Sequence, residues 1–242
     1  MSVVPVCTAH DADGVDVWFL NKKDRCNEYR NITRARDSDE VTGSGPGSEI
    51  SVESLFRSRR SNGDATMTGT RLHEILDPYV RRCEWIEAAN ERRMEQGLLD
   101  LSVNTPLPRL ELPKPINIIM ITDGRADDDP ASVLRGIAER LDDIRAPPFQ
   151  VGVQFFQVGG DEIAASALRE LDEELSSAGG LQSARDGNRK RVRDMVDTVT
   201  FDYVADGQNG ARVRVLTRDG ILKTVLGAVN RRHDNSKLAT RT

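Results

Sequence analysis

The chain has 242 residues, of which 38% are hydrophobic and 30% are charged, and its formal net charge is −5 at pH 7. A chain of this length buries a substantial core as one large or two small domains, and the excess of charged residues places polar segments in tails or loops. Acidic runs interleave the short basic stretches, so nucleic acid is not expected as a partner. No apolar stretch approaches the roughly 20 residues of a membrane-spanning helix, so no membrane partner is expected either.

Cysteine usage indicates a reducing compartment. Cys7, Cys26 and Cys83 form no C-x-x-C pair, and no secretory segment precedes them. Secreted domains use cysteines in pairs as disulfides, whereas isolated cysteines are typical of free thiols. We therefore expect a cytosolic or nuclear protein without disulfides.

The first expected strand covers residues 15–20, which follow an Asp13-Gly14 turn and become wholly apolar at their end. Residues 22–53 then change character, with charged residues first and a run of Gly, Ser and Pro at 43–48. Such a composition buries too little surface to offset the entropy lost on ordering. We interpret residues 22–53 as a flexible insertion.

A long helix is predicted after the loop that ends at Gly69. Apolar residues recur there at helical spacing, and the charged end of the pattern extends to about Gln96 as an exposed extension. Pro78 lies inside the pattern and is expected to kink the helix because proline lacks an amide proton. Residues 97–115 contain four prolines and form a second flexible insertion. The apolar positions of the helix are Leu72, Ile75, Leu76, Tyr79 and Cys83.

The middle of the chain alternates strand and helix. Ile116–Thr122 is nearly continuous in hydrophobicity, the pattern of a parallel strand covered on both faces. Asp129 and Pro130 suit the cap and first turn of a following helix. Residues 150–158 form the next strand. A helix opening at Asp161 and Glu162 follows, and its expected apolar face is Ile163, Ala167, Leu168, Leu171 and Leu175.

The last predicted elements are a short helix at residues 192–196, a strand at 198–204 and a helix from about Asp219. Alternating strands and helices with short connections predict an α/β fold with a doubly wound, mainly parallel sheet and helices on both faces. Ligand sites of such folds form at the carboxyl ends of the strands.

Five stretches of the chain resemble those of a known family of domains. They are residues 7–14 with 19–21, Thr66-Met67-Thr68-Gly69, residues 119–124 ending in Thr122-Asp123-Gly124, residues 152–159, and Asp219-Gly220-Ile221-Leu222-Lys223. These stretches resemble the von Willebrand factor type A domain, and in detail its fungal, intracellular branch. The resemblance covers about residues 3–232, with residues 233–242 as a polar tail, and it implies the doubly wound fold and a protein-binding function without enzymatic activity.

The family's binding site is a metal-ion-dependent adhesion site, in which an Asp-x-Ser-x-Ser loop, a Thr and an Asp hold one divalent cation. The resemblance assigns the Thr to Thr66 and the Asp to Asp123, with Thr68 as a further candidate. Carboxylate, hydroxyl and water oxygens suit Mg²⁺, which keeps a coordination position for an incoming ligand. The same residues also have local interpretations, because Asp-Gly suits turns and threonines cap helices.

The sequence departs from the family at its start. No Asp-x-Ser-x-Ser occurs in the chain, and only fourteen residues precede Val15. The family's central first strand and its metal loop are therefore expected to be missing. With one hydroxyl and one carboxylate left, we expect only weak binding of Mg²⁺ or another divalent cation.

Three interpretations of function remain. The first is a module that binds a protein partner, with a degenerate adhesion site at Thr66 and Asp123. The second is a hydrolase or phosphoryl-transfer enzyme that uses Asp123, although no Asp-x-Asp or nucleophile-elbow motif accompanies it. The third is a non-functional truncated copy. Asp127, Asp128 and Asp129 are interpreted as a solvated loop with a helix cap rather than as additions to a cation site.

Overall fold

The computed structural model describes residues 15–20, 28–32, 65–96, 108–123, 125–158, 162–178, 193–199, 202–205 and 212–215. The chain divides into two compact units, Met1–Met67 and Thr68–Thr242, and each is described by itself. Within the described ranges, no helix is long and apolar enough to cross a membrane.

The first unit contains an antiparallel pair of strands. Val15–Trp18 (β1) pairs with Glu28–Ile32 (β2), and the register shifts between Val15 and Val17. The strand predicted at 15–20 is confirmed over Val15–Trp18, but its described partner runs antiparallel rather than parallel. That partner lies inside the segment 22–53, which the sequence analysis assigned to a flexible insertion. Five residues of mixed polarity give no clear alternation, so composition alone does not reveal this strand.

The second unit is built on a parallel sheet of three described strands, Ile116–Thr122 (β3), Val151–Gln157 (β4) and Val196–Val199 (β5), in the order β3-β4-β5. The register pairs Ile116 with Val151 and Thr122 with Gln157, so β3 and β4 end side by side. The parallel sheet and its helices confirm the α/β class.

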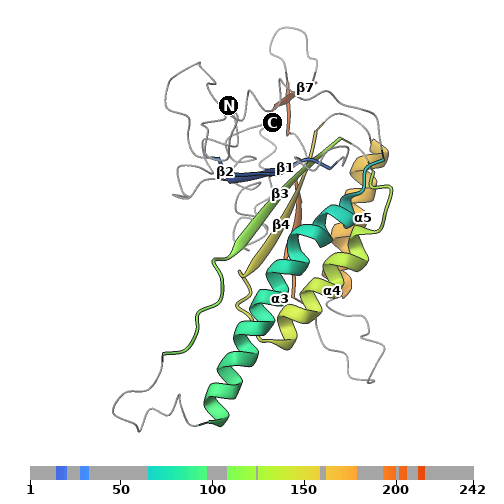
Figure 1. Ribbon diagram of the computed structural model, residues 1–242. Coiled ribbons are helices and arrows are strands. Elements are labelled where there is room, and N and C mark those ends of the chain that lie inside the picture. The colour runs from blue at the N-terminus through green and yellow to red at the C-terminus, as the bar shows by residue number, and fades with distance from the viewer. Residues whose placement is uncertain are drawn as a thin grey trace, which may run out of the picture. The chain divides into compact units, whose positions relative to one another are not determined.

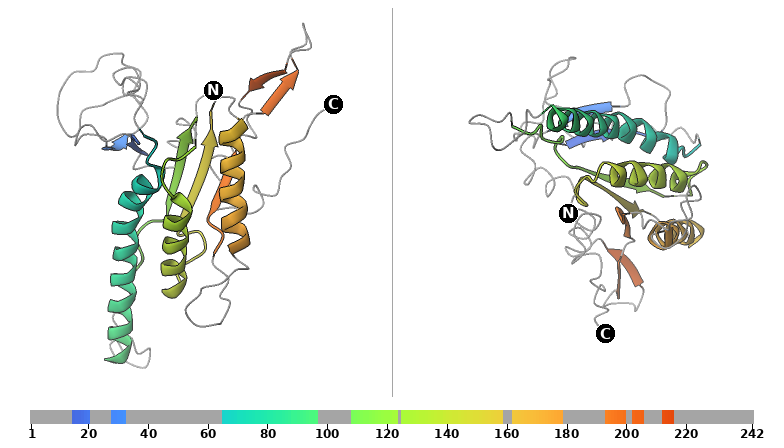
Figure 2. Two further views of the ribbon diagram at one scale, coloured as in Figure 1. Left: turned by 90° about the vertical axis from the view of Figure 1, so that its right-hand side faces the viewer. Right: turned by 90° about the horizontal axis from the view of Figure 1, so that it is seen from below.

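Three helices accompany this sheet: Thr68–Glu95 (α3), Pro130–Asp143 (α4) and Glu162–Ala178 (α5). The connections β3-α4-β4 and β4-α5-β5 proceed in the same direction across the sheet, and right-handed crossovers then place α4 and α5 on the same face. Figure 1 and Figure 2 show these helices along one side of the sheet, with α3 packed on α4.

The core of this unit lies between the helices and β4. All seven residues of β4 are buried, and β4 is the central strand, with β3 on one edge and β5 on the other. β3 differs from the prediction that both its faces are covered, since Asn117 and Ile121 are exposed. The side chains that fill the core include Leu72, Leu76 and Val80 of α3, Leu134, Ile137 and Leu141 of α4, and Val151, Val153 and Phe155 of β4.

Arg140 fastens α4 to α3. Its Nε and one Nη donate to the two carboxylate oxygens of Glu84 at 2.7 and 2.8 Å, and its other Nη donates to Asp77 at 2.9 Å. The hydrogen bond from Arg140 lowers the pKa of the Asp77 carboxyl below its ordinary value. A planar guanidinium makes such paired contacts, which fix the geometry of the two helices as well as attracting their charges.

The long helix matches the prediction in position, and Pro78 lies within it. The second half of the proline-rich connection, residues 108–115, differs from the flexible insertion predicted for residues 97–115. Residues 108–115 form no helix or strand, yet Asn90 of α3 exchanges two hydrogen bonds with Leu110, through its amide nitrogen at 3.0 Å and its amide oxygen at 2.9 Å. Tyr79 donates to the carbonyl of Lys114 at 2.9 Å. Side chains of α3 thus satisfy backbone groups that irregular structure leaves open.

Two predictions at the end of the chain are wrong. Residues 193–195 are not helical, and Val196 is the first residue of β5. The carbonyl of Met195, just before it, already accepts the amide of Val153 in β4. The single strand predicted at 198–204 is divided between β5 and Asp202–Ala205 (β6), which pairs antiparallel with Arg212–Val215 (β7). The helix expected from Asp219 and the polar tail lie outside the described residues.

Candidate functional site

The carboxyl ends of β3 and β4 form a common edge in the second unit. Thr122 and Gln157 are register partners at the end of these strands, and the amide of Val158 donates to the carbonyl of Thr122 at 2.8 Å. Thr122 is buried and Asp123, the next residue, is exposed. A strand end therefore presents the Asp123 carboxylate to solvent at the edge where α/β proteins bind their ligands.

An open groove of about 620 Å³ lies at this edge. Its floor includes Phe155 of β4, one wall comes from the first three turns of α5, and the other comes from the loop that leads into α4. The lining residues are Thr68, Thr122, Arg125, Ala126, Asp128, Pro130, Phe155, Glu162, Ile163, Ser166, Ala167, Leu168, Glu170 and Leu171.

Asp128 caps the amino terminus of α3 from a distant part of the chain. Its two carboxylate oxygens accept the amides of Gly69 and Thr70 at 2.8 and 2.7 Å. Met67, which precedes the helix, has no side-chain oxygen to offer these amides. A carboxylate at this end also interacts favourably with the helix dipole. Asp128 is therefore occupied in holding the loop against α3.

Gly69 permits this close contact. A Cβ atom at position 69 would lie 2.9 Å from the carbonyl oxygen of Asp129 and 3.0 Å from the nitrogen of Pro130. Both are backbone atoms, which cannot rotate away as a flexible side chain can. The glycine of the Thr-Met-Thr-Gly motif is thus explained by packing of the first turn of α3 against the 128–130 loop.

Asp129 caps α4, as predicted from the sequence. It accepts the amide of Ser132 at 3.1 Å and the Ser132 hydroxyl, and Pro130 occupies the first helical position. These hydrogen bonds lower the pKa of the Asp129 carboxyl, and the one from the Ser132 hydroxyl has the largest effect. Of the three consecutive aspartates, Asp129 is the predicted helix cap, whereas Asp128 was expected in a solvated loop and instead caps a second helix.

The predicted metal ligands are distributed over both units. Thr66 is half-buried and belongs to the first unit, whereas Asp123 and Thr68 belong to the second, where Thr68 is buried and lines the groove. Among the described residues, no three His, Cys, Asp or Glu side chains gather as a metal-binding group. The second unit offers the hydroxyl of Thr68 and the carboxylate of Asp123, while the Asp128 oxygens already accept amides. These donors fit tightly held Mg²⁺ poorly, since Mg²⁺ prefers six oxygen ligands.

Of the residues predicted from the sequence, Thr68 lines the groove and Asp123 does not, and the groove with its acidic rim was not predicted. Glu162 and Glu170 come from α5, and Arg125 comes from the loop after β3. The acids at the start of α5 were interpreted only as a favourable charge for the helix dipole. The available signal was the spacing of Glu162 and Glu170 with Ser166, because positions four apart share one face of a helix.

Comparisons with family models, with curated proteins and with solved structures found no match to this chain.

Proposed function

We propose that this chain is a protein-binding module of the von Willebrand factor type A kind, with a doubly wound sheet whose carboxyl edge contacts the partner. The observation that carries the proposal is the groove at the ends of β3 and β4. Crevices at this edge are the usual ligand sites of open α/β sheets. The groove is open and has an apolar floor, a combination that suits contact with a protein segment.

The chemistry of the groove suggests the partner. Three carboxylates, Asp128, Glu162 and Glu170, and one guanidinium, Arg125, line it, which leaves an excess of negative charge. Phe155 and the leucines of α5 supply an apolar floor. A protein segment with lysine or arginine next to an aliphatic side chain complements both features, because opposite charges attract while the apolar contact excludes water.

A divalent cation has a minor part in this proposal. Asp123 is the exposed carboxylate at the edge, with Thr68 nearby in the groove lining and Thr66 as the family's counterpart. We expect weak Mg²⁺ binding that depends on Asp123. Calorimetric titration of the chain and of Asp123→Asn with Mg²⁺ measures this dependence. Tight binding that persists in Asp123→Asn would remove Asp123 from the site.

A phage-displayed library of random peptides tests the binding function. Peptides selected on the chain are expected to carry lysine or arginine beside aliphatic residues. Ser166→Arg adds bulk and positive charge to the groove and should weaken the selected peptides by at least about tenfold, since like charges at an interface are strongly unfavourable. Fluorescence anisotropy with the synthetic peptides gives the affinities.

Glu173→Arg is the matched control, because Glu173 is exposed on the same helix, does not line the groove and receives the same new side chain. Its affinity should stay close to that of the unmodified chain. The proposal fails if no selected peptide loses affinity in Ser166→Arg, or if the peptides that do lose affinity in this variant are acidic.

A further inference from the structure

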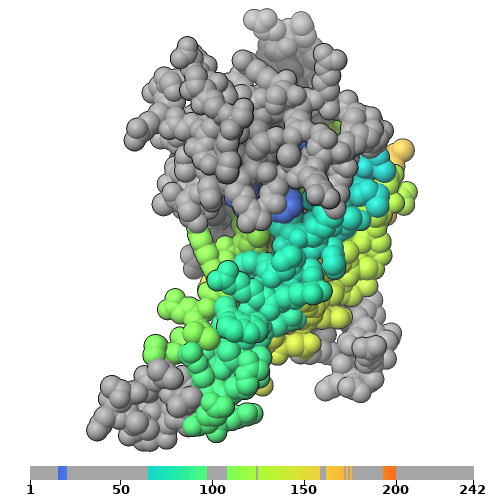
Figure 3. Space-filling view, viewed as in Figure 1, coloured from blue at the N-terminus to red at the C-terminus, as the bar shows by residue number. Residues whose placement is uncertain are grey.

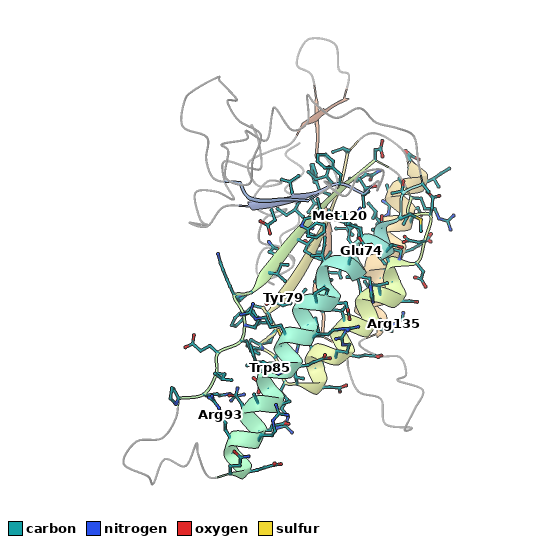
Figure 4. The ribbon with its side chains drawn as sticks, in the orientation of Figure 1. Glu74, Tyr79, Trp85, Arg93, Met120 and Arg135 are labelled. Carbon is teal, nitrogen blue, oxygen red and sulfur yellow. The ribbon has the colours of Figure 1, made fainter. Side chains whose placement is uncertain are left out.

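Trp85 is an exposed aromatic residue on the long helix α3. It has 63% of its surface accessible, whereas tryptophan is highly buried on average in folded proteins. Figure 4 marks Trp85 on this helix, and Figure 3 shows the carboxyl-terminal half of α3, coloured teal to green, on the molecular surface. The helix already buries its opposite side through Leu76, Val80 and Cys83. Trp85 therefore belongs to a second face of α3 that the core does not use.

The neighbours of Trp85 on this face are basic or small. Residues three, four or seven positions away lie on the same side of a helix. We define the Trp85 face by Trp85, the residues three and four positions away on both sides and the residue seven positions later, which are Arg81, Arg82, Ala88, Ala89 and Arg92.

The face is cationic, and the two acidic residues nearest to Trp85 in the sequence pair with arginines outside it. Glu84 pairs with Arg140 of α4, and Glu87 pairs with Arg109 of the following segment at 2.5 Å. Arg82 and Arg92 are exposed and form no ion pair with any residue that the structure describes.

Arg81 does pair with Asp77 through its Nε, at 2.9 Å. Its side chain remains 72% exposed, so most of the guanidinium is still available to a partner. The Trp85 face thus presents one large aromatic ring among three arginines without a carboxylate of its own.

We propose that the Trp85 face binds an acidic amphipathic helix of a partner protein. Tryptophan and arginine are the residues that contribute most often to the binding energy of protein interfaces. The side chains of Ala88 and Ala89 are small, so the backbone of a second helix can approach next to the ring. The face extends over about 17 Å from Arg81 to Arg92 at 1.5 Å per residue, a length that suits three turns of a partner helix.

Charge decides between this occupant and two others. A second copy of the chain would bring arginines against arginines, since the face has no carboxylate to complement them. A nucleic acid carries a charge at every phosphate and would also meet the exposed flanking carboxylates Glu91 and Glu95, whereas a helix can place its few carboxylates opposite the arginines and away from these two. An amphipathic helix places its carboxylates along two edges only and leaves an apolar centre for the ring.

This surface is separate from the groove of the proposed function. The Trp85 face lies on α3, and the residues that define it do not line the groove at the carboxyl edge of the sheet. The two proposals therefore succeed or fail independently, because each predicts a ligand of opposite charge.

The test uses the full chain and a fluorescein-labelled synthetic peptide of roughly 18 residues, long enough to form a helix. Leucines at helical spacing form one side of the peptide and glutamates flank them. Fluorescence anisotropy is expected to show saturable binding that weakens with added salt. Trp85→Ala and Arg82→Glu should each weaken this binding at least about tenfold.

Phe149→Ala is the matched control, because Phe149 is another exposed aromatic of the same unit, with 54% of its surface accessible. It should bind the peptide as the unmodified chain does, and so should Ser166→Arg in the groove. Circular dichroism melting curves of the variants confirm that each remains folded. The proposal is overturned if the acidic peptide does not bind, if folded Trp85→Ala binds it equally, or if a peptide with lysine in place of glutamate binds as well. Displacement of the acidic peptide by a single-stranded oligonucleotide of higher affinity would also overturn it.

Discussion

At the scale of single residues, the junction between α3 and the 128–130 loop depends on atoms rather than on residue classes. Asp128 supplies both oxygens to the first turn of α3, and Gly69 supplies the space in which the loop backbone approaches. Neither residue can be exchanged for a similar one without loss of stability. An alanine at position 69 has the better helix propensity, yet it meets the Asp129 carbonyl.

We expect Gly69→Ala to destabilise the chain by about 1–3 kcal/mol, the range for forcing an extra methyl group into a packed site. Gly136→Ala is the control, since it lies inside α4 and a Cβ there meets no atom within 4 Å. It should stabilise the chain by about 0.5–1 kcal/mol, the ordinary gain of alanine over glycine in a helix. Urea denaturation measures both. Equal stability of Gly69→Ala and the unmodified chain would show that the loop moves away freely.

At the scale of elements, α4 is fixed at both ends by side chains outside its hydrophobic face. Asp129 and Ser132 close its amino terminus. At its carboxyl terminus the buried guanidinium of Arg193 donates to the carbonyls of Leu141, Ala146 and Pro147 at 2.8 to 3.0 Å. The last carbonyls of a helix lack partners within the helix, and Arg193 donates to one of them, Leu141, and to two carbonyls of the segment that follows α4.

Arg193 also joins α4 to the start of β5 through Asp142, which accepts from its Nε at 2.7 Å and from its backbone amide at 3.0 Å. Arg193→Lys keeps the charge but has too few donors for this set of acceptors, so buried oxygens lose partners. We expect a loss of about 2–4 kcal/mol. Thermal unfolding followed by circular dichroism measures it against Arg169→Lys, an exposed arginine of α5 expected to change stability by less than about 0.5 kcal/mol. Similar melting temperatures for both variants would contradict this assignment.

At the scale of the whole second unit, Tyr79 connects three segments that are distant in sequence. Tyr79 belongs to α3. Its hydroxyl donates to the carbonyl of Lys114 before β3 and accepts a hydrogen bond from the side-chain Nε2 of Gln150 before β4. Figure 4 shows Tyr79 on the side of α3 that faces the segment leading into β3. Burial is the main cause that raises the pKa of Tyr79 to about 12, and burial also raises the pKa of the Cys83 thiol one turn away.

The raised pKa predicts alkaline destabilisation. A phenol in the unfolded chain loses its proton near pH 10, whereas folded Tyr79 keeps it to a higher pH. Its contribution to stability is therefore complete below about pH 10 and is lost as the pH rises toward about pH 12. Tyr79→Phe should be less stable at neutral pH by about 1 kcal/mol, from the lost hydrogen bond, and should show a smaller decline at high pH.

Urea denaturation at several pH values in a Cys83→Ala background separates the phenol from the thiol. Tyr29 and Tyr203 remain in every variant and serve as an internal reference for tyrosine ionisation. If Tyr79→Phe declines with pH as steeply as its parent, the alkaline dependence comes from other groups.

Local patterns in the sequence determined most of the helices and the parallel strands. The apolar spacing in α4 and α5, the Asp129-Pro130 start signal and the nearly continuous hydrophobicity of β3 all act within a few residues. The face of α5 was partly wrong, however, since Ile163 is exposed and Ala164 is buried in its place. A helix shows its apolar side in the sequence, but the exact rotation depends on what it packs against. The Asp123 position at a strand end was also readable, because a strand and its following turn are adjacent in the chain.

Tertiary structure alone decided the features that join distant segments. Nothing in the sequence around Asp128 indicates that it caps a helix 59 residues earlier, nor that Gly69 must leave room for the Asp129 backbone. The exposure of one side of β3, the antiparallel pairing of β1 with β2 and the groove at the carboxyl edge likewise arise from pairing and packing between elements. Local propensities set the type of each element because they act within a few bonds. Which elements meet is decided by burial and backbone hydrogen bonding over the whole chain, which no short window of sequence contains.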